Sequence, residues 1–160
     1  MELIGSNWEV LIRLIVAMVL GGLLGFEREL AGKTAGLRTY SLISVGAALY
    51  VVISQVVAEQ FSGVTSFDPL RVASSIVVGI GFVGAGMIIF KEHEHTVKGL
   101  TTAAGIWVAA GIGMASGFGL YAVALFATLI ALFIFIVLYY VDRQVRKGEL
   151  KEFRKKGNVG

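Results

Sequence analysis

The sequence has no cysteine, one proline and few charges: only 16% of its 160 residues are Asp, Glu, Lys or Arg, and 56% are hydrophobic. Without cysteine, the chain has no disulfide, thiolate nucleophile or thiolate metal site. About a quarter of the residues in a soluble domain are charged, so this composition is typical of a membrane protein. The 21 glycines favour close helix packing in lipid, because small residues let backbones approach one another.

Asp, Glu, Lys, Arg and His are missing from four long stretches, Leu14–Phe26, Thr39–Ala58, Val72–Phe90 and Leu100–Val141. Ionisable residues in mid-membrane are the usual sign of a proton relay or a carboxylate ion path, so their absence counts against both mechanisms within one protomer. A Mg²⁺ path lined by hydroxyls, glycine carbonyls and Gln55 is still compatible with the sequence. Mg²⁺ gives up its water reluctantly, so such a path can carry the ion with its hydration shell.

Five apolar runs, each near the roughly 20 residues that cross a bilayer, account for most of the chain. They are Trp8–Phe26, Thr39–Ala58, Val72–Phe90, Leu100–Ser116 and Leu120–Val141. We therefore predict an all-α membrane protein, with five transmembrane helices in residues 1–141 and a basic cytoplasmic tail at 142–160. The first run follows no basic n-region and precedes no small-residue cleavage site, so we expect it to be retained rather than removed as a signal peptide.

Basic residues in the short connections predict the orientation of these helices. The first and third connections and the tail are rich in Lys and Arg, whereas the second offers only Arg71 and the fourth none. The positive-inside rule then places the N-terminus outside and the tail in the cytoplasm. Seven of the 14 basic residues follow Asp142, and such a cluster beside a membrane suits an anionic lipid leaflet better than nucleic acid.

Local signals mark the starts of two helices. Ser6-x-x-Glu9 fits a capping box, and Asp68-Pro69 offers an N-cap acceptor followed by a proline at the first helical position. Arg13 interrupts the first apolar run, but Glu9 lies one turn earlier on the same face, so we expect an ion pair between them near the interface.

A weak internal repeat has a period of 63 residues. An ungapped shift by this period aligns eight identical residues: Gly21, Glu29, Gly36, Leu37, Thr39, Ile43, Val45 and Ala47 with Gly84, Glu92, Gly99, Leu100, Thr102, Ile106, Val108 and Ala110. If the repeat is real, helices one and two and helices three and four form two hairpins of the same orientation, with the fifth helix added. Shared glycine and alanine bias is the alternative explanation.

The third run contains Gly79-x-Gly81-x-x-Gly84, the spacing of a dinucleotide-binding turn. That fold also needs sheet partners and an acidic residue about 20 positions later, and here the region reads Lys98-Gly99-Leu100-Thr101, so we reject it. At 100° per residue, the small residues instead form two stripes, one with Ser75, Gly79, Phe82 and Gly86 and one with Ser74, Gly81 and Ala85. We therefore predict that the third helix is the central packing element, through Ser75, Gly79, Gly81, Gly84 and Gly86. We also expect a homodimer or other homo-oligomer.

Charges gather at the helix ends. If the first hairpin is tight, Glu27 pairs with Arg38 across it; the alternative is that Glu27, Arg28 and Arg38 only anchor the interface and fix topology. Asp68 and Arg71 lie at the end of the third helix that is predicted to face outside the cell. The simple explanation for these two charges is that they cap the helix.

Neither a metal centre nor an enzyme is evident. Glu27, Asp68, His93 and His95 are the candidates for a metal ligand, but two histidines two residues apart do not close a site. Both histidines lie in one loop with no activated serine or cofactor motif, so we predict that the chain is not an enzyme.

Four blocks of sequence resemble one known family. They read GLLGFEREL, AGLRTYSLISVGAAL, DPLRVASSIVVGIGFVGAGMI and GLTTAAGIWVAAGIGMASGFGLY. In this order, from about Gly21 to Tyr121, they are similar to the membrane domain of the MgtC/SapB (YhiD) proteins. Four linked blocks are far more specific than one glycine motif.

The resemblance implies a five-helix protein of the bacterial inner membrane, with a role in growth under Mg²⁺ limitation, in acid or ion stress and, in pathogens, in survival inside macrophages. Members are often labelled as Mg²⁺ transporters, whereas the virulence branch is better described as regulators of other membrane machinery such as ATP synthase. We therefore expect either a transport element with Mg²⁺ as ligand or substrate, or a modulator that binds another membrane protein through its glycine-rich faces. Neither needs a cofactor.

By the same resemblance, the functional polar residues are Glu27, Arg28, Arg38, Thr39, Asp68, Arg71, Thr101 and Thr102. Two departures stand out. The virulence branch tends to have Asn at the position of Thr101, and many members continue into a cytoplasmic ACT-like domain beyond the position of Gly160. Both favour the shorter SapB-like branch, or a shortened chain.

Overall fold

The computed structural model describes residues 7–61, 68–91, 96–141 and 143–144. Its helices are α1 (Asn7–Leu30), α2 (Leu37–Gln60), α3 (Pro69–Gly86), α4 (Leu100–Gly117) and α5 (Tyr121–Phe133), and the π-helical turn η2 (Ile134–Leu138) continues α5. Strands β1 (Ile89–Lys91) and β2 (Thr96–Lys98) form one small antiparallel hairpin between α3 and α4. The prediction of an all-α fold is confirmed, with this hairpin as the exception.

Four helices in the described part of the chain are long and apolar enough to cross a membrane: α1, α2, α4 and the segment Tyr121–Val141 formed by α5 and its continuation. The apolar part of α3, Leu70–Gly86, is shorter. We expected the third run to be helical as far as Phe90, but α3 ends at Gly86, because the β-branched and aromatic residues that follow form β1. Five crossings therefore remain a prediction.

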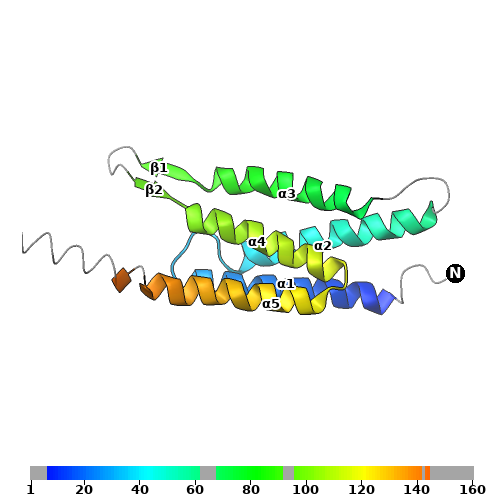
Figure 1. Ribbon diagram of the computed structural model, residues 1–160, viewed down its shortest axis with the longest axis horizontal. Coiled ribbons are helices and arrows are strands. Elements are labelled where there is room, and N and C mark those ends of the chain that lie inside the picture. The colour runs from blue at the N-terminus through cyan, green and yellow to red at the C-terminus, as the bar shows by residue number, and fades with distance from the viewer. Residues whose placement is uncertain (1–6, 62–67, 92–95, 142, 145–160) are drawn as a thin grey trace, which may run out of the picture.

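α4 is the central helix, because it contacts α1, α2, α3 and α5. In Figure 1, α3 lies on one side of the bundle, α1 and α5 lie on the other, and α2 and α4 lie between them. The prediction that α3 is the central packing helix is therefore wrong for the single chain. A Cβ atom at Gly79, Gly81 or Gly86 would meet nothing within 4 Å, and one at Gly84 would lie 3.7 Å from Ala103.

The glycines that bring helices together lie on α1 and α4. A Cβ atom at Gly21 would overlap the Ser44 side chain, and one at Gly113 would overlap the Ser44 carbonyl oxygen. One at Gly117 would lie 2.8 Å from the Ala48 carbonyl oxygen. Since none of these positions leaves room for a side chain, α1, α2 and α4 cross at backbone distance around the fully buried Ser44.

The helical hairpins α1–α2 and α3–α4 correspond at several positions, which supports the internal repeat. Gly36 precedes α2 and Gly99 precedes α4, 63 positions apart. A Cβ at Gly21 would approach the Tyr40 carbonyl oxygen, and one at the matching Gly84 would approach the matching Ala103. Figure 1 shows α1 and α3 running in one direction and α2 and α4 in the other. The duplication itself stays a prediction.

The helix-start signals have different outcomes. Asp68 is the N-cap of α3, its Oδ1 accepts a hydrogen bond of 2.9 Å from the Leu70 N–H, and Pro69 is at the first helical turn, so this prediction is confirmed. Arg13 forms the expected ion pair with Glu9. Ser6 of the capping box, the histidine loop with His93 and His95, and nearly all of the basic tail lie outside the described residues.

Candidate functional site

Arg28 is the most deeply buried charge among the described residues, with 3% of its surface exposed. Its Nη2 donates to Glu27 Oε1 over 2.7 Å and its Nε donates to Glu27 Oε2. The guanidinium carbon lies 3.9 Å from the centre of the Phe135 ring. A charge taken out of water needs such partners, and a desolvated cation over an aromatic face gains about 2 kcal/mol.

Tyr40 brings α2 and α4 into the same place. Its side chain is fully buried and its hydroxyl donates to the Thr102 carbonyl oxygen over 3.4 Å. Gly105 makes room for it, because a Cβ there would overlap the Tyr40 hydroxyl and lie 2.7 Å from Phe135 Cζ. Glu27, Arg28, Tyr40, Thr102 and Phe135 thus form one group, the Arg28 cluster, with residues from α1, α2, α4 and η2.

The π-helical turn explains how Phe135 reaches the arginine. In η2 the hydrogen bonds span five residues instead of four, so the helix after α5 widens and its side chains turn relative to an α-helix. Phe135 is the buried residue of this turn. Such turns are frequent at functional sites, and here the irregularity coincides with the one aromatic ring that covers a buried charge in the described chain.

Glu29 links the Arg28 cluster to the start of α2. Gly36, the N-cap of α2, has no side chain to cap the helix, and Glu29 Oε2 instead accepts a hydrogen bond of 2.9 Å from the Leu37 N–H. A carboxylate at a helix N-terminus also interacts favourably with the helix dipole. The helical hairpin of α1 and α2 is therefore closed by a carboxylate from α1, a contact that the sequence alone does not predict.

The predicted polar residues divide between the two ends of the bundle. Glu27, Arg28, Arg38, Thr39, Thr101 and Thr102 lie where α1 ends and α2 and α4 begin, whereas Asp68 and Arg71 lie at the opposite end, where α3 begins. Only Glu27, Arg28 and Thr102 join the cluster. Arg38 and Thr101 are exposed, and Thr39 is half-buried.

The expected ion pair between Glu27 and Arg38 is replaced by another. Both Glu27 oxygens accept from Arg28, the next residue on α1, while Arg38 is exposed on α2. The burial of Arg28 explains the choice, because a buried guanidinium must keep a carboxylate partner, whereas an exposed one can use water.

The metal candidates do not gather into a site. Among the described residues, no group of three His, Asp or Glu side chains lies close enough to hold an ion. Glu27 is already held by a cation, Asp68 caps α3 at the other end, and His93 and His95 fall outside the described residues.

A second network, at the opposite end, was only partly foreseen. Besides its ion pair with Glu9, Arg13 donates from Nη1 to Gln55 Oε1 over 2.7 Å and to the Gly117 carbonyl oxygen over 3.0 Å. It thereby ties α1 to α2 and to the last turn of α4, where the helix dipole favours a cation. An arginine inside an apolar run was the sequence signal for this contact.

The MgtC family model matches residues 14–144, which is most of the chain. The match includes the whole Arg28 cluster, but Arg13 and Glu9 of the second network lie just before its first residue. The chain belongs to the MgtC family. This confirms the resemblance carried by the four sequence blocks. Together with four apolar helices, family membership indicates a multi-pass membrane protein.

Relatives in the family are longer proteins. The chain is 44% identical over 101 residues to the putative magnesium transporter YhiD of Escherichia coli K12. The aligned segment covers 60% of this chain and 45% of that protein. It is 54% identical over 88 residues to protein MgtC of Brucella abortus, covering 55% and 34% of the two chains. A Synechocystis protein is 46% identical over 96 residues, covering 60% and 38%. The chain thus spans less than half the length of these relatives, and no solved structure matches it.

Proposed function

We propose that the chain supports magnesium homeostasis in a bacterial inner membrane as a modulator of another membrane protein, and that the Arg28 cluster is its working end. The magnesium connection rests on family membership and on the name of the E. coli relative, a putative magnesium transporter. Buried charges are costly and are kept only with partners, and Arg28 is the most deeply buried charge among the described residues, which makes its cluster the strongest candidate for the working end.

One observation favours modulation over conduction: both oxygens of the Glu27 carboxylate are held by Arg28, and Phe135 covers the guanidinium. A path for a divalent cation needs free oxygen ligands or a negative potential, and an adjacent guanidinium removes both. At the same time, α1, α2 and α4 touch at backbone distance, which leaves no room for a hydrated ion between them.

The first experiment measures Mg²⁺ entry into proteoliposomes that contain the purified chain and an internal Mg²⁺-sensitive dye. We expect entry no faster than in empty liposomes, with correct folding checked by circular dichroism and gel filtration. Transport is the second candidate, favoured by the name of the E. coli relative. Entry that a Glu27→Gln/Asp68→Asn variant loses would establish transport and overturn the modulator proposal.

The second experiment tests the cluster in cells. Free Mg²⁺ is measured in E. coli lacking its YhiD, grown at low external Mg²⁺, with the chain or its variants expressed. We expect Phe135→Leu to reduce the effect of the chain on cellular Mg²⁺ at least several-fold. Phe133→Leu, the same substitution on a 58% exposed ring two residues earlier, is the matched control and should act like the unmodified chain. Equal effects of the two variants would remove the cluster from the function.

A further inference from the structure

The β1–β2 hairpin has one face that is entirely apolar and exposed. The register pairs Ile89 with Lys98, Phe90 with Val97 and Lys91 with Thr96. Opposed residues of an antiparallel pair share a face, and neighbours along a strand alternate, so Phe90 and Val97 lie together on one side and Lys98 lies on the other. Phe90 is 61% exposed and Val97 is 48% exposed.

The position of the hairpin explains why α3 is short. In Figure 1 the hairpin continues α3 and α4 along the long axis of the molecule, at the end of the bundle where α1 ends. The apolar part of α3, Leu70–Gly86, is about 26 Å long at 1.5 Å per residue, a little less than the roughly 30 Å of the hydrocarbon core. Apolar residues continue after it to Phe90. The strands therefore begin about where the hydrocarbon ends.

Two constraints restrict where such a hairpin can lie. A two-stranded sheet leaves outward backbone groups unpaired, and lipid-exposed sheet edges do not occur in the hydrocarbon region. Full exposure to water would leave Phe90 and Val97 solvated on the hairpin surface, at a cost in burial free energy. The headgroup layer satisfies both constraints, because it hydrates the backbone edge and takes up aromatic side chains.

We propose that the β1–β2 hairpin is an interfacial lipid-binding element. Its Phe90 and Val97 face enters the headgroup layer, and Lys98 on the other face then lies at the depth where its ammonium group can bind a lipid phosphate. In this arrangement α3 ends near the edge of the hydrocarbon, and the hairpin anchors the α3–α4 connection at the membrane surface. The occupant of the exposed face is the lipid surface and not a second protein.

The absence of cysteine allows a direct test by single-site spin labelling. Nitroxides are attached to four variants in phosphatidylglycerol-containing proteoliposomes: Phe90→Cys, Thr96→Cys on the opposite face, Val78→Cys as a 74% exposed position of α3, and Thr34→Cys as an exposed loop position. Collisions with oxygen, which partitions into lipid, and with a water-soluble nickel chelate report the depth of each label.

We expect the Phe90 label at headgroup depth, between the Val78 label in hydrocarbon and the Thr34 label in water, and nickel access at Thr96 at least twice that at Phe90. Nickel access at Phe90 equal to that at Thr34 would place the hairpin in water and overturn the proposal. Protection of the Phe90 label from both reagents would show that protein covers the face, and would also overturn it.

The charge requirement is tested by changing the lipid. In vesicles of phosphatidylcholine alone, the Phe90 label should lie shallower, with nickel access at least doubled, and a Phe90→Cys/Lys98→Gln variant should lose most of this dependence on lipid charge. The same depth in both lipids would show that the anionic leaflet plays no part.

Discussion

Arg28 occupies a position where most side chains would be neutral. Its charge is tolerated because Glu27 balances it, Phe135 covers it and no water needs to reach it. Removing one partner of a buried ion pair is costly, because the other charge stays behind unpaired, whereas removing both is often nearly neutral. This asymmetry distinguishes a buried pair from an exposed one and can be measured with single and double variants.

We expect Arg28→Met to destabilise the folded chain by about 3 kcal/mol and to leave Glu27 unpaired. The double variant Glu27→Gln/Arg28→Met should recover at least half of that loss, because no unpaired charge remains. Thermal unfolding in mild detergent, followed by tryptophan fluorescence, gives the comparison. A double variant as unstable as the sum of the two single variants would show that Glu27 and Arg28 do not act as a pair.

Arg13 makes a different kind of contact, a clamp between three helices. We expect Arg13→Lys, which keeps the charge but loses the planar set of donors, to cost about 1.5 to 3 kcal/mol, because the contacts to Gln55 and to the Gly117 carbonyl oxygen are charge-assisted hydrogen bonds. The same unfolding assay tests it. Arg71→Lys, at an exposed position of α3, is the control and should change stability by less than about 0.5 kcal/mol.

At the scale of helices, glycine has two opposite roles in this chain. Gly113 faces the Ser44 carbonyl oxygen, whereas Gly79 faces open space beside α2 and α3. A small-residue stripe in a sequence reports only that a close approach is possible. Which stripe is used depends on the neighbours, and here the helix with the strongest stripe lies at the periphery.

We expect Gly113→Ala to destabilise the bundle, because its methyl group would overlap backbone that cannot move aside, by roughly 1 to 3 kcal/mol as for other overpacked sites. Gly79→Ala should instead stabilise it by about 0.5 to 1 kcal/mol, because alanine is the better helix former and its methyl group meets nothing within 4 Å. Thermal unfolding of both variants decides the matter. Loss of stability at Gly79→Ala would mean that this face is covered, as in the homo-oligomer expected from sequence.

Helix positions were predictable from the sequence because apolar runs and charge-free stretches define them directly. The run Leu100–Ser116 differs from α4 by one residue, and the Asp68 cap was correct. The contacts of Arg28 were not predictable, since its ring partner Phe135 lies 107 positions away and reaches it through a π-helical turn. Nothing in the local sequence marks that turn.

The strand residues illustrate the same limit. The apolar run Val72–Phe90 predicts a single helix, whereas the helix ends at Gly86 and Ile89–Lys91 form a strand, because apolar composition alone does not distinguish a helix end from a short strand. Likewise, Glu27 and Arg38 were paired in the prediction because both lie near one hairpin. Glu27 pairs with Arg28 instead because Arg28 is buried, and the sequence does not show which of the two arginines is buried.

At the scale of the whole molecule, orientation is the property that sequence predicts and the bundle alone does not test. We expect the turn between α4 and α5 outside and the connection between α1 and α2 in the cytoplasm. In intact spheroplasts, a membrane-impermeant maleimide should label Leu120→Cys and not Thr34→Cys, two positions that are both exposed. The reverse pattern would invert the topology and move the Arg28 cluster to the outer side.

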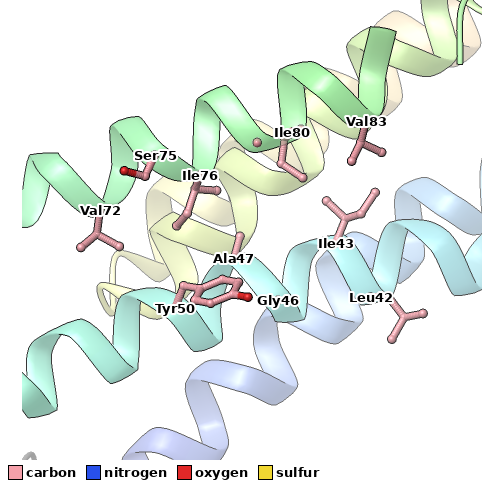
Figure 2. Close-up of a pocket in the computed structure, with 11 residues that line it drawn as sticks. Leu42, Ile43, Gly46, Ala47, Tyr50, Val72, Ser75, Ile76, Ile80 and Val83 are labelled. Atoms are coloured by element: carbon pink, nitrogen blue, oxygen red, sulfur yellow. The ribbon is translucent and has the colours of Figure 1, made fainter. Parts of the chain in front are cut away.

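The open space beside Gly79 belongs to a groove between α2 and α3, and this groove has a consequence for the whole molecule. Figure 2 shows residues of the two helices, among them Ile76 and Ile80 of α3 and Ala47 of α2, around a volume of about 410 Å³. If α3 closed onto α2, the protein would occupy less area in the plane of the membrane. Tension in a stretched bilayer would do work against such a contraction, so tension would favour the open groove that the structure shows. Spin labels at Gly46→Cys and Gly79→Cys should therefore move apart when vesicles are osmotically swollen, and an unchanged distance would show that the groove has no mechanical response.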